Sequence, residues 1–168
     1  MRSIATFLLP VFFVSALSAQ TNVLPEADRT LAHDIFKQLV EINTTDSVGS
    51  TTVAAEAMRK RLLEAGFPAA DVVVLGPNQR KGNMVARYRG RTGSALAPVL
   101  IIGHIDVVEA KRSDWTTDPF QLVEKDGYFY GRGTQDMKEA DTSVVESFIL
   151  APRFRQKLDR RWLNSKGT

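Results

Sequence analysis

Cysteine is absent from the 168-residue sequence, and histidine occurs only twice, as His33 and His104. The lack of cysteine excludes disulfides, zinc sites built from thiolates and a cysteine nucleophile. Two histidines leave little room for metal chemistry that needs several imidazoles. Hydrophobic residues make up 43% of the chain and charged residues 24%. These are ordinary globular values, so a wholly disordered chain is not expected.

Positive charge is concentrated at the end of the chain. Residues 151–168 hold six basic residues and one acidic residue, although the formal charge of the whole chain is only +3. The region before this tail is therefore net acidic, and we expect it to bind no nucleic acid. Two interpretations of the basic tail stay open: a solvated extension, or one that touches an anionic surface with Phe154 and Trp162 as apolar anchors.

Residues 1–19 have the features of an export signal. A short positive start at Arg2 is followed by an apolar run over residues 4–19 that ends in small residues, so cleavage is expected after Ser18 or Ala19. The run is short for a membrane span and contains Pro10, which leaves an uncleaved anchor as the alternative. We expect an exported mature chain, periplasmic or secreted, with no stable membrane span.

The pattern after the signal alternates between helical and strand periods. Apolar spacing predicts helices over residues 29–42, 51–65 and 137–150. Short β-rich runs between turn residues predict strands over 71–75, 83–89 and 98–103, and a hairpin formed by 120–124 and 128–130. Because residues 99–102 are apolar on both faces, 98–103 is expected to be a central buried strand. The sequence thus predicts an α/β fold with helices packed on a mixed β-sheet.

Candidate functional residues follow the predicted 98–103 strand and precede the third predicted helix. His104 and Asp106 come directly after the 98–103 strand and project to the same side, where Asp106 can orient the imidazole. Alone, this pair is weak evidence for a metal site and is more typical of a hydrogen-bonded structural histidine. Asp136 ends a glycine-rich turn before the third helix, where it can either cap the helix or bridge two metal ions. His33 and Lys138 are expected on solvated faces, with contact between Lys138 and a substrate carboxylate as the alternative.

Several spaced blocks resemble one enzyme family. The blocks are Gly103-His104-Ile105-Asp106-Val107-Val108, Trp115 with Asp118-Pro119-Phe120, Asp126-Gly127, Tyr130-Gly131-Arg132-Gly133 and Asp136-Met137-Lys138. In this order they resemble the first metal-binding half of the co-catalytic zinc peptidases and deacylases, which include aminoacylase, acetylornithine deacetylase, succinyl-diaminopimelate desuccinylase and carnosinase. The resemblance runs from about residue 25 to residue 149.

The resemblance implies a set of roles. His104 is a ligand of one zinc ion, Asp106 is the catalytic carboxylate that orients it, and Asp136 bridges two zinc ions. The implied substrates are peptides or N-acyl amino acids, whose amide carbonyl is attacked by a metal-activated water. Glu109 departs from the family pattern, which usually has proline there, and Glu139 stands where glycine is usual.

Other parts of the family pattern have no counterpart in the chain. The general-base glutamate pair and the later metal ligands are missing, so residues 20–150 are interpreted as the N-terminal part of a catalytic domain. We expect residues 151–168 to be unrelated to the family, and the chain to be truncated or frame-shifted after about residue 150. The alternative to an amide hydrolase is therefore an inactive fragment, with uncovered apolar surface and poor solubility.

Overall fold

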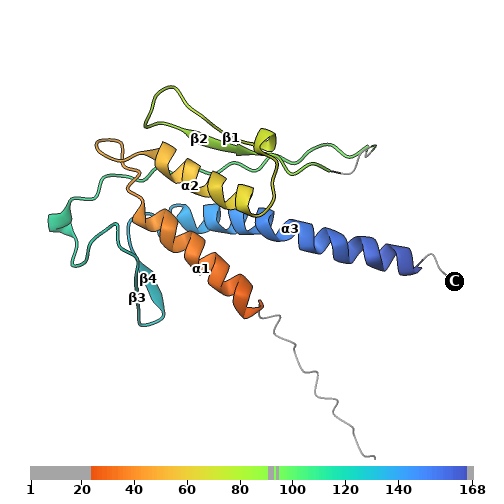
Figure 1. Cartoon of the computed structure of the whole chain (residues 1–168). Helices are drawn as coiled ribbons and strands as arrows, with labels where there is room; N and C mark the ends of the chain where they lie inside the picture. The colour runs from red at the N-terminus through yellow and green to blue at the C-terminus, as the bar shows by residue number, and fades with distance from the viewer. Residues whose placement is uncertain (1–23, 91–92, 94, 166–168) are drawn as a thin grey trace, which may run out of the picture.

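The computed structural model describes residues 24–90, 93 and 95–165, and its helices and strands confirm the α/β character of the chain. The predicted export signal, residues 1–19, lies outside the described residues. Within those ranges, no helix is both long enough and apolar enough to cross a membrane. In Figure 1 the helices lie beside one strand pair, and a long extended path leads from it to a second strand pair.

The first two predicted helices are confirmed. Helix α1 spans Glu26–Glu41 and helix α2 spans Thr51–Glu64. The Ser50 side chain caps α2 by accepting a hydrogen bond from the Val53 amide. Gly66 follows α2 with φ of 93°, a left-handed conformation that ends the helix and that glycine adopts without strain. Both helices therefore begin and end close to where their sequence signals place them.

The strands form two antiparallel pairs. Strands β1 (Val72–Leu75) and β2 (Asn83–Ala86) make one pair, with Val72 opposite Ala86. Strands β3 (Val123–Lys125) and β4 (Tyr128–Tyr130) make the predicted hairpin. Asp126 and Gly127 at its tip both have positive φ, as a tight two-residue hairpin turn requires. Within the described residues the strands are thus antiparallel, rather than joined in one mixed sheet.

The prediction of a central buried strand over 98–103 is wrong. This segment belongs to neither strand pair, and Val99, Leu100 and Ile102 are 87%, 81% and 79% exposed. A strand that is apolar on both faces is buried only when neighbouring strands flank it and layers cover both faces. The described strands pair with one another, β1 with β2 and β3 with β4, and none of them pairs with residues 98–103. The segment therefore has the composition of a core strand but lacks the strand neighbours that would bury it.

Helix α3 (Lys138–Ser165) begins where the sequence predicts but continues beyond the expected end near residue 150. It passes through Pro152, and the residues that follow are mostly good helix formers such as Arg, Gln, Lys and Leu. Arg153 on this extension forms an ion pair with Asp28 of α1, at 2.8 Å between Nη1 and Oδ1. The first part of the basic tail is therefore helical and attached to α1.

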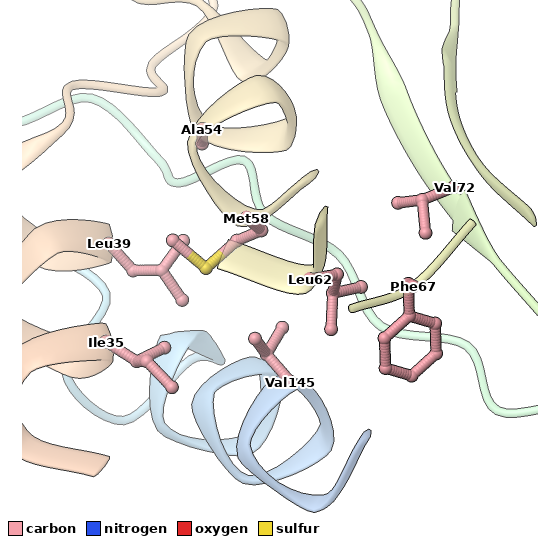
Figure 2. Packing of buried hydrophobic residues seen from close by; sticks show 8 residues of the cluster. All are labelled: Ile35, Leu39, Ala54, Met58, Leu62, Phe67, Val72 and Val145. Atoms are coloured by element: carbon pink, nitrogen blue, oxygen red, sulfur yellow. The ribbon is translucent and has the colours of Figure 1, made fainter. Parts of the chain in front are cut away.

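The hydrophobic core lies where the helices meet the first strand pair. Figure 2 shows its side chains converging from the helices, from strand β1 and from the loop after α2 that carries Phe67: Ile35, Leu39, Ala54, Met58, Leu62, Phe67, Val72 and Val145. Each of these residues is at most 8% exposed. Val145 is the residue of helix α3 that is buried in this cluster. This core fixes the start of α3, where the candidate site begins.

Candidate metal centre

The structure brings the three predicted site residues together. The His104 imidazole lies between two carboxylates: Nδ1 is 3.3 Å from Asp106 Oδ1, and Nε2 is 3.0 Å from Asp136 Oδ1. Asp106 lies two positions along the same extended segment, whereas Asp136 comes from the turn before α3. Nδ1 also lies 3.3 Å from the Asp106 backbone carbonyl, its hydrogen-bond partner, so both the backbone and the carboxylate of Asp106 contact this nitrogen. Nε2 faces the carboxylate that comes from a distant part of the chain.

Glycines shape the turn that carries Asp136. Gly133 has φ of 85°, and a Cβ placed on it would lie 2.7 Å from Val107 Cγ1 and 3.0 Å from the Lys138 side chain. A larger residue would therefore be strained in its backbone and would push the two site segments apart. The Lys138 amide donates to the Gly133 carbonyl at 3.0 Å, which joins the turn directly to the start of α3.

Lys138 lies in the core rather than on a solvated face, so that prediction is wrong. It is 0% exposed, and its Nζ donates to the Leu39 carbonyl at 2.7 Å and to the Ile42 carbonyl at 2.9 Å. These carbonyls belong to the end of α1, where backbone oxygens lack helical partners. Burial lowers the pKa of the Lys138 ammonium to about 8, against an opposing effect of Asp141. Lys138 therefore ties the Asp136 turn to α1.

Asp141 is a second buried charge beside the site. The residue is 9% exposed, and its Oδ2 has no hydrogen-bond partner among the described residues. Burial raises the pKa of its carboxyl group to about 6, although the positive charge of His104 works in the opposite direction. A Cβ on Gly103 would lie 2.2 Å from Asp141 Oδ1, so this carboxylate packs directly against the backbone that precedes His104.

Sequence reasoning missed the inward direction of Lys138 and Asp141, although a signal for it exists. Lys138 stands seven residues before the buried Val145, and Asp141 stands four residues before it. Residues at those spacings share one face of a helix. The periodicity of α3 thus places both charged side chains on its buried face, but their charge argued for solvent.

Charge around the imidazole favours its protonated form. Partial burial works to lower the pKa of His104, but contact with the Asp106 backbone and the negative charges of Asp106 and Asp136 outweigh it. The pKa of His104 is therefore raised above its ordinary value of 6.5. Two carboxylates next to one imidazole attract any cation, whether a proton or a metal ion.

The imidazole and its carboxylates open into a pocket of about 320 Å³. One wall is formed by His104, Asp106, Val107 and Val108, and the other by residues 131–136 of the glycine-rich turn. His33, the other histidine, lies elsewhere: it is partly exposed on α1 beside Glu124 and the Phe129 ring. Of the two histidines, His104 therefore lines the pocket and His33 does not.

The donor types fit part of a zinc site. Imidazole nitrogen and carboxylate oxygen are both common zinc ligands, and His104 and Asp136 present one of each at the pocket. Among the described residues, no group of three or more His, Cys, Asp or Glu side chains is placed to hold a metal ion. The described part of the chain thus offers two donors and the orienting carboxylate Asp106, fewer than a closed tetrahedral site requires.

Comparison with known proteins gives the same family as the sequence blocks. Residues 100–160 match the sequence model of the peptidase family M20/M25/M40, a range that includes all three site residues. This match and the relatives described next confirm the predicted resemblance to the zinc peptidases and deacylases over part of the chain.

The curated relatives are deacylases. Acetylornithine deacetylase of Pasteurella multocida is 36% identical over 98 residues, which are 58% of this chain and 24% of that protein. Succinyl-diaminopimelate desuccinylase of Ralstonia nicotianae is 38% identical over 101 residues, 59% of this chain and 25% of that protein. A probable succinyl-diaminopimelate desuccinylase of Staphylococcus epidermidis is 44% identical over 80 residues, 47% of this chain and 19% of that protein. The matched part of the chain spans between 19% and 25% of the length of these relatives.

Proposed function

We propose that the chain is part of a metal-dependent hydrolase that cleaves amide bonds in peptides or N-acyl amino acids. The observation that carries the proposal is the His104 imidazole held between two carboxylates, one of them from a turn 32 residues away. The names of the relatives support the reaction class, because a deacetylase and a desuccinylase both remove an acyl group.

The residues of the pocket have distinct parts in this proposal. His104 Nε2 and Asp136 would hold a metal ion, for which zinc suits the donor types, and Asp136 would be the carboxylate shared with a second ion. Asp106 lies against Nδ1, so it fixes the orientation of the ring and leaves Nε2 as the nitrogen that would bind the metal. A bound zinc ion would polarise the substrate carbonyl and lower the pKa of a bound water molecule. The pocket of about 320 Å³ provides room for the acyl group beside these residues.

The test is zinc binding followed by turnover. Calorimetric titration of the full chain with zinc should show binding that His104→Ala and Asp136→Asn each weaken by about tenfold or more. His33→Ala is the matched control, because the chain has only two histidines and His33 lies outside the pocket. Equal weakening by His33→Ala, or no effect of His104→Ala, would contradict the proposed centre.

Turnover separates the proposal from its alternative, a chain that is catalytically inactive as it stands. The alternative is favoured by the lack of a three-donor group among the described residues. Zinc-loaded protein should be assayed with N-acetyl amino acids, N-succinyl amino acids and dipeptides. Hydrolysis that disappears in Asp136→Asn supports the hydrolase. Zinc binding without hydrolysis of any of them supports the inactive chain.

We also propose that the chain is exported, on the basis of the apolar run over residues 4–19 and the small residues that follow it. N-terminal sequencing of the mature protein should find a start near Gln20. A mature protein that retains Arg2 would contradict cleavage of this signal.

A further inference from the structure

The segment that carries His104 and Asp106 has no regular structure to hold it in place. Residues 98–110 form no strand in the described chain, and Val99–Ile102 are largely exposed. Val107 is the best anchored of its residues: it is 7% exposed, and its amide donates to the Thr44 carbonyl at 3.4 Å. The His104 amide also donates to Met137 Sδ at 3.4 Å. Side chains that must stay at fixed distances need firmer support than two long hydrogen bonds. Other contacts must therefore hold this segment.

Glu109 joins the segment to Ser47 by two hydrogen bonds. Its Oε1 accepts a hydrogen bond from the Ser47 amide at 3.0 Å, and its Oε2 accepts one from the Ser47 hydroxyl at 2.8 Å. Hydrogen bonds to an ionised carboxylate are about twice as strong as bonds between neutral groups. These bonds from Ser47 lower the pKa of the Glu109 carboxyl group, so it is ionised at neutral pH.

The loop that Glu109 reaches is itself well anchored. It connects α1 to α2, and the Arg80 guanidinium donates to the carbonyls of Ser47 at 3.0 Å and Asp46 at 2.8 Å. The Asp46 carboxylate also pairs with Lys81. Because two side chains from a different part of the chain, those of Arg80 and Lys81, bind this loop, a side chain that is bound to it is held in a defined position.

The backbone of Glu109 contacts the other half of the site. Its carbonyl accepts a hydrogen bond from Arg132 Nη2 at 3.3 Å. Arg132 belongs to the glycine-rich turn that carries Asp136, and its guanidinium lies over the Trp115 ring, 5.0 Å from the ring centre. Glu109 therefore touches both the anchored loop and the turn that supplies the second carboxylate.

We propose that Glu109 is a positioning residue for the metal centre. Its carboxylate fastens the 104–109 segment to Ser47, and its carbonyl fastens the same segment to Arg132. Proline, which the resembled family usually has at this position, offers no side-chain acceptor. A proline restrains the backbone through its ring, independently of salt. In this chain the charged Glu109 side chain restrains the segment instead, and it does so only because Ser47 binds it.

The tether is tested by amide hydrogen exchange of the full chain. Glu109→Ala should speed exchange of the Ser47 amide by about three- to tenfold and speed exchange over residues 104–107 as well. Glu109→Gln should restore most of the protection, because its amide can accept from the Ser47 backbone and donate to its hydroxyl. Glu64→Ala, which removes an exposed acid from α2, is the matched control and should leave both regions unchanged.

The consequence for the site rests on the proposed function and is tested by zinc affinity. Glu109→Ala should weaken zinc binding by about three- to tenfold, with Glu109→Gln close to the unsubstituted chain and with the same thermal midpoint of unfolding in all three. Unchanged exchange over residues 104–107 in Glu109→Ala, or unchanged zinc affinity, would overturn the inference. If the unsubstituted chain binds no zinc, the proposed function fails, and exchange over residues 104–107 alone decides whether Glu109 positions the segment.

Discussion

Replacing Asp141 by asparagine should stabilise the chain at neutral pH. Asp141 is 9% exposed, and its Oδ2 has no partner among the described residues. Burial of an ionised carboxylate costs free energy, and the positive charges of His104 and Lys138 offset only part of that cost here, because the pKa of Asp141 stays raised. Asparagine has nearly the same shape but no charge, so Asp141→Asn removes that cost while keeping the packing against Gly103.

The size of the stabilisation by Asp141→Asn, and the pH range in which it appears, follow from the pKa of Asp141. Burial raises it from 3.8 to about 6, and about 1.4 kcal/mol per pKa unit gives an upper limit of about 3 kcal/mol. Solvent at the exposed edge of the side chain screens the charge, so we expect about 1–2 kcal/mol. Below pH 3.8 the carboxyl group is protonated in both the folded and the unfolded chain. Between pH 3.8 and 6 only the unfolded chain releases the proton, so the folded state loses stability as pH rises. Above pH 6 the penalty is constant.

Urea unfolding followed by tryptophan fluorescence measures this difference. The gain in free energy of unfolding for Asp141→Asn should be near zero at pH 3.5, rise through pH 5 and stay constant above pH 6.5. Asp114→Asn, at an exposed aspartate in the described 3₁₀ turn Arg112–Asp114, is the matched control and should show no such rise. A gain that is the same at pH 3.5 and pH 7, or a loss at pH 7, would refute the argument that an ionised Asp141 destabilises the fold.

Three further changes test other parts of the structure. Gly133→Ala should lower the free energy of unfolding by about 2–4 kcal/mol, against about 1 kcal/mol for Gly66→Ala, because both have positive φ but only Gly133 is in close contact with other side chains. Ile101→Lys should reduce self-association in sedimentation velocity, since Ile101 is 57% exposed in an apolar segment; equal association of both proteins would show that this segment is not the cause. The Arg89 guanidinium holds the pKa of Asp71 below its ordinary value, so the stability lost in Arg89→Ala should be full at pH 6 and shrink as pH falls below 3.8. A loss that does not depend on pH would contradict this ion pair.

The parts of the fold that could be predicted are those fixed by short stretches of sequence. Apolar residues at helical spacing place α1 and α2, and Ser50 and Gly66 mark where α2 begins and ends. Asp126 and Gly127 fix the β3–β4 hairpin because few residue pairs accept positive φ at both positions. Each of these elements satisfies most of its backbone hydrogen bonds within itself, so no distant partner is needed to predict it.

The parts that could not be predicted depend on distant partners. Residues 99–102 have the composition of a buried strand, but whether they form one depends on strands beside them, and the described chain places none there. The sequence predicts that α3 ends near residue 150, where the basic tail begins, but the helix continues to Ser165. The ion pair between Arg153 and Asp28 links that extension to α1, and a contact over 125 positions leaves no local signal.

The candidate site could be predicted in part for the same physical reason. The period of an extended chain puts His104 and Asp106 on one side, and glycines in a turn before a helix allow Asp136 to face outward from the helix start. What holds these residues together is tertiary: Lys138 reaches the end of α1, and Glu109 reaches the loop before α2. Both tethers contact the region where α1 ends and α2 begins. The distance between His104 and Asp136 therefore depends on that region, and substitutions there should change metal affinity without touching a metal ligand.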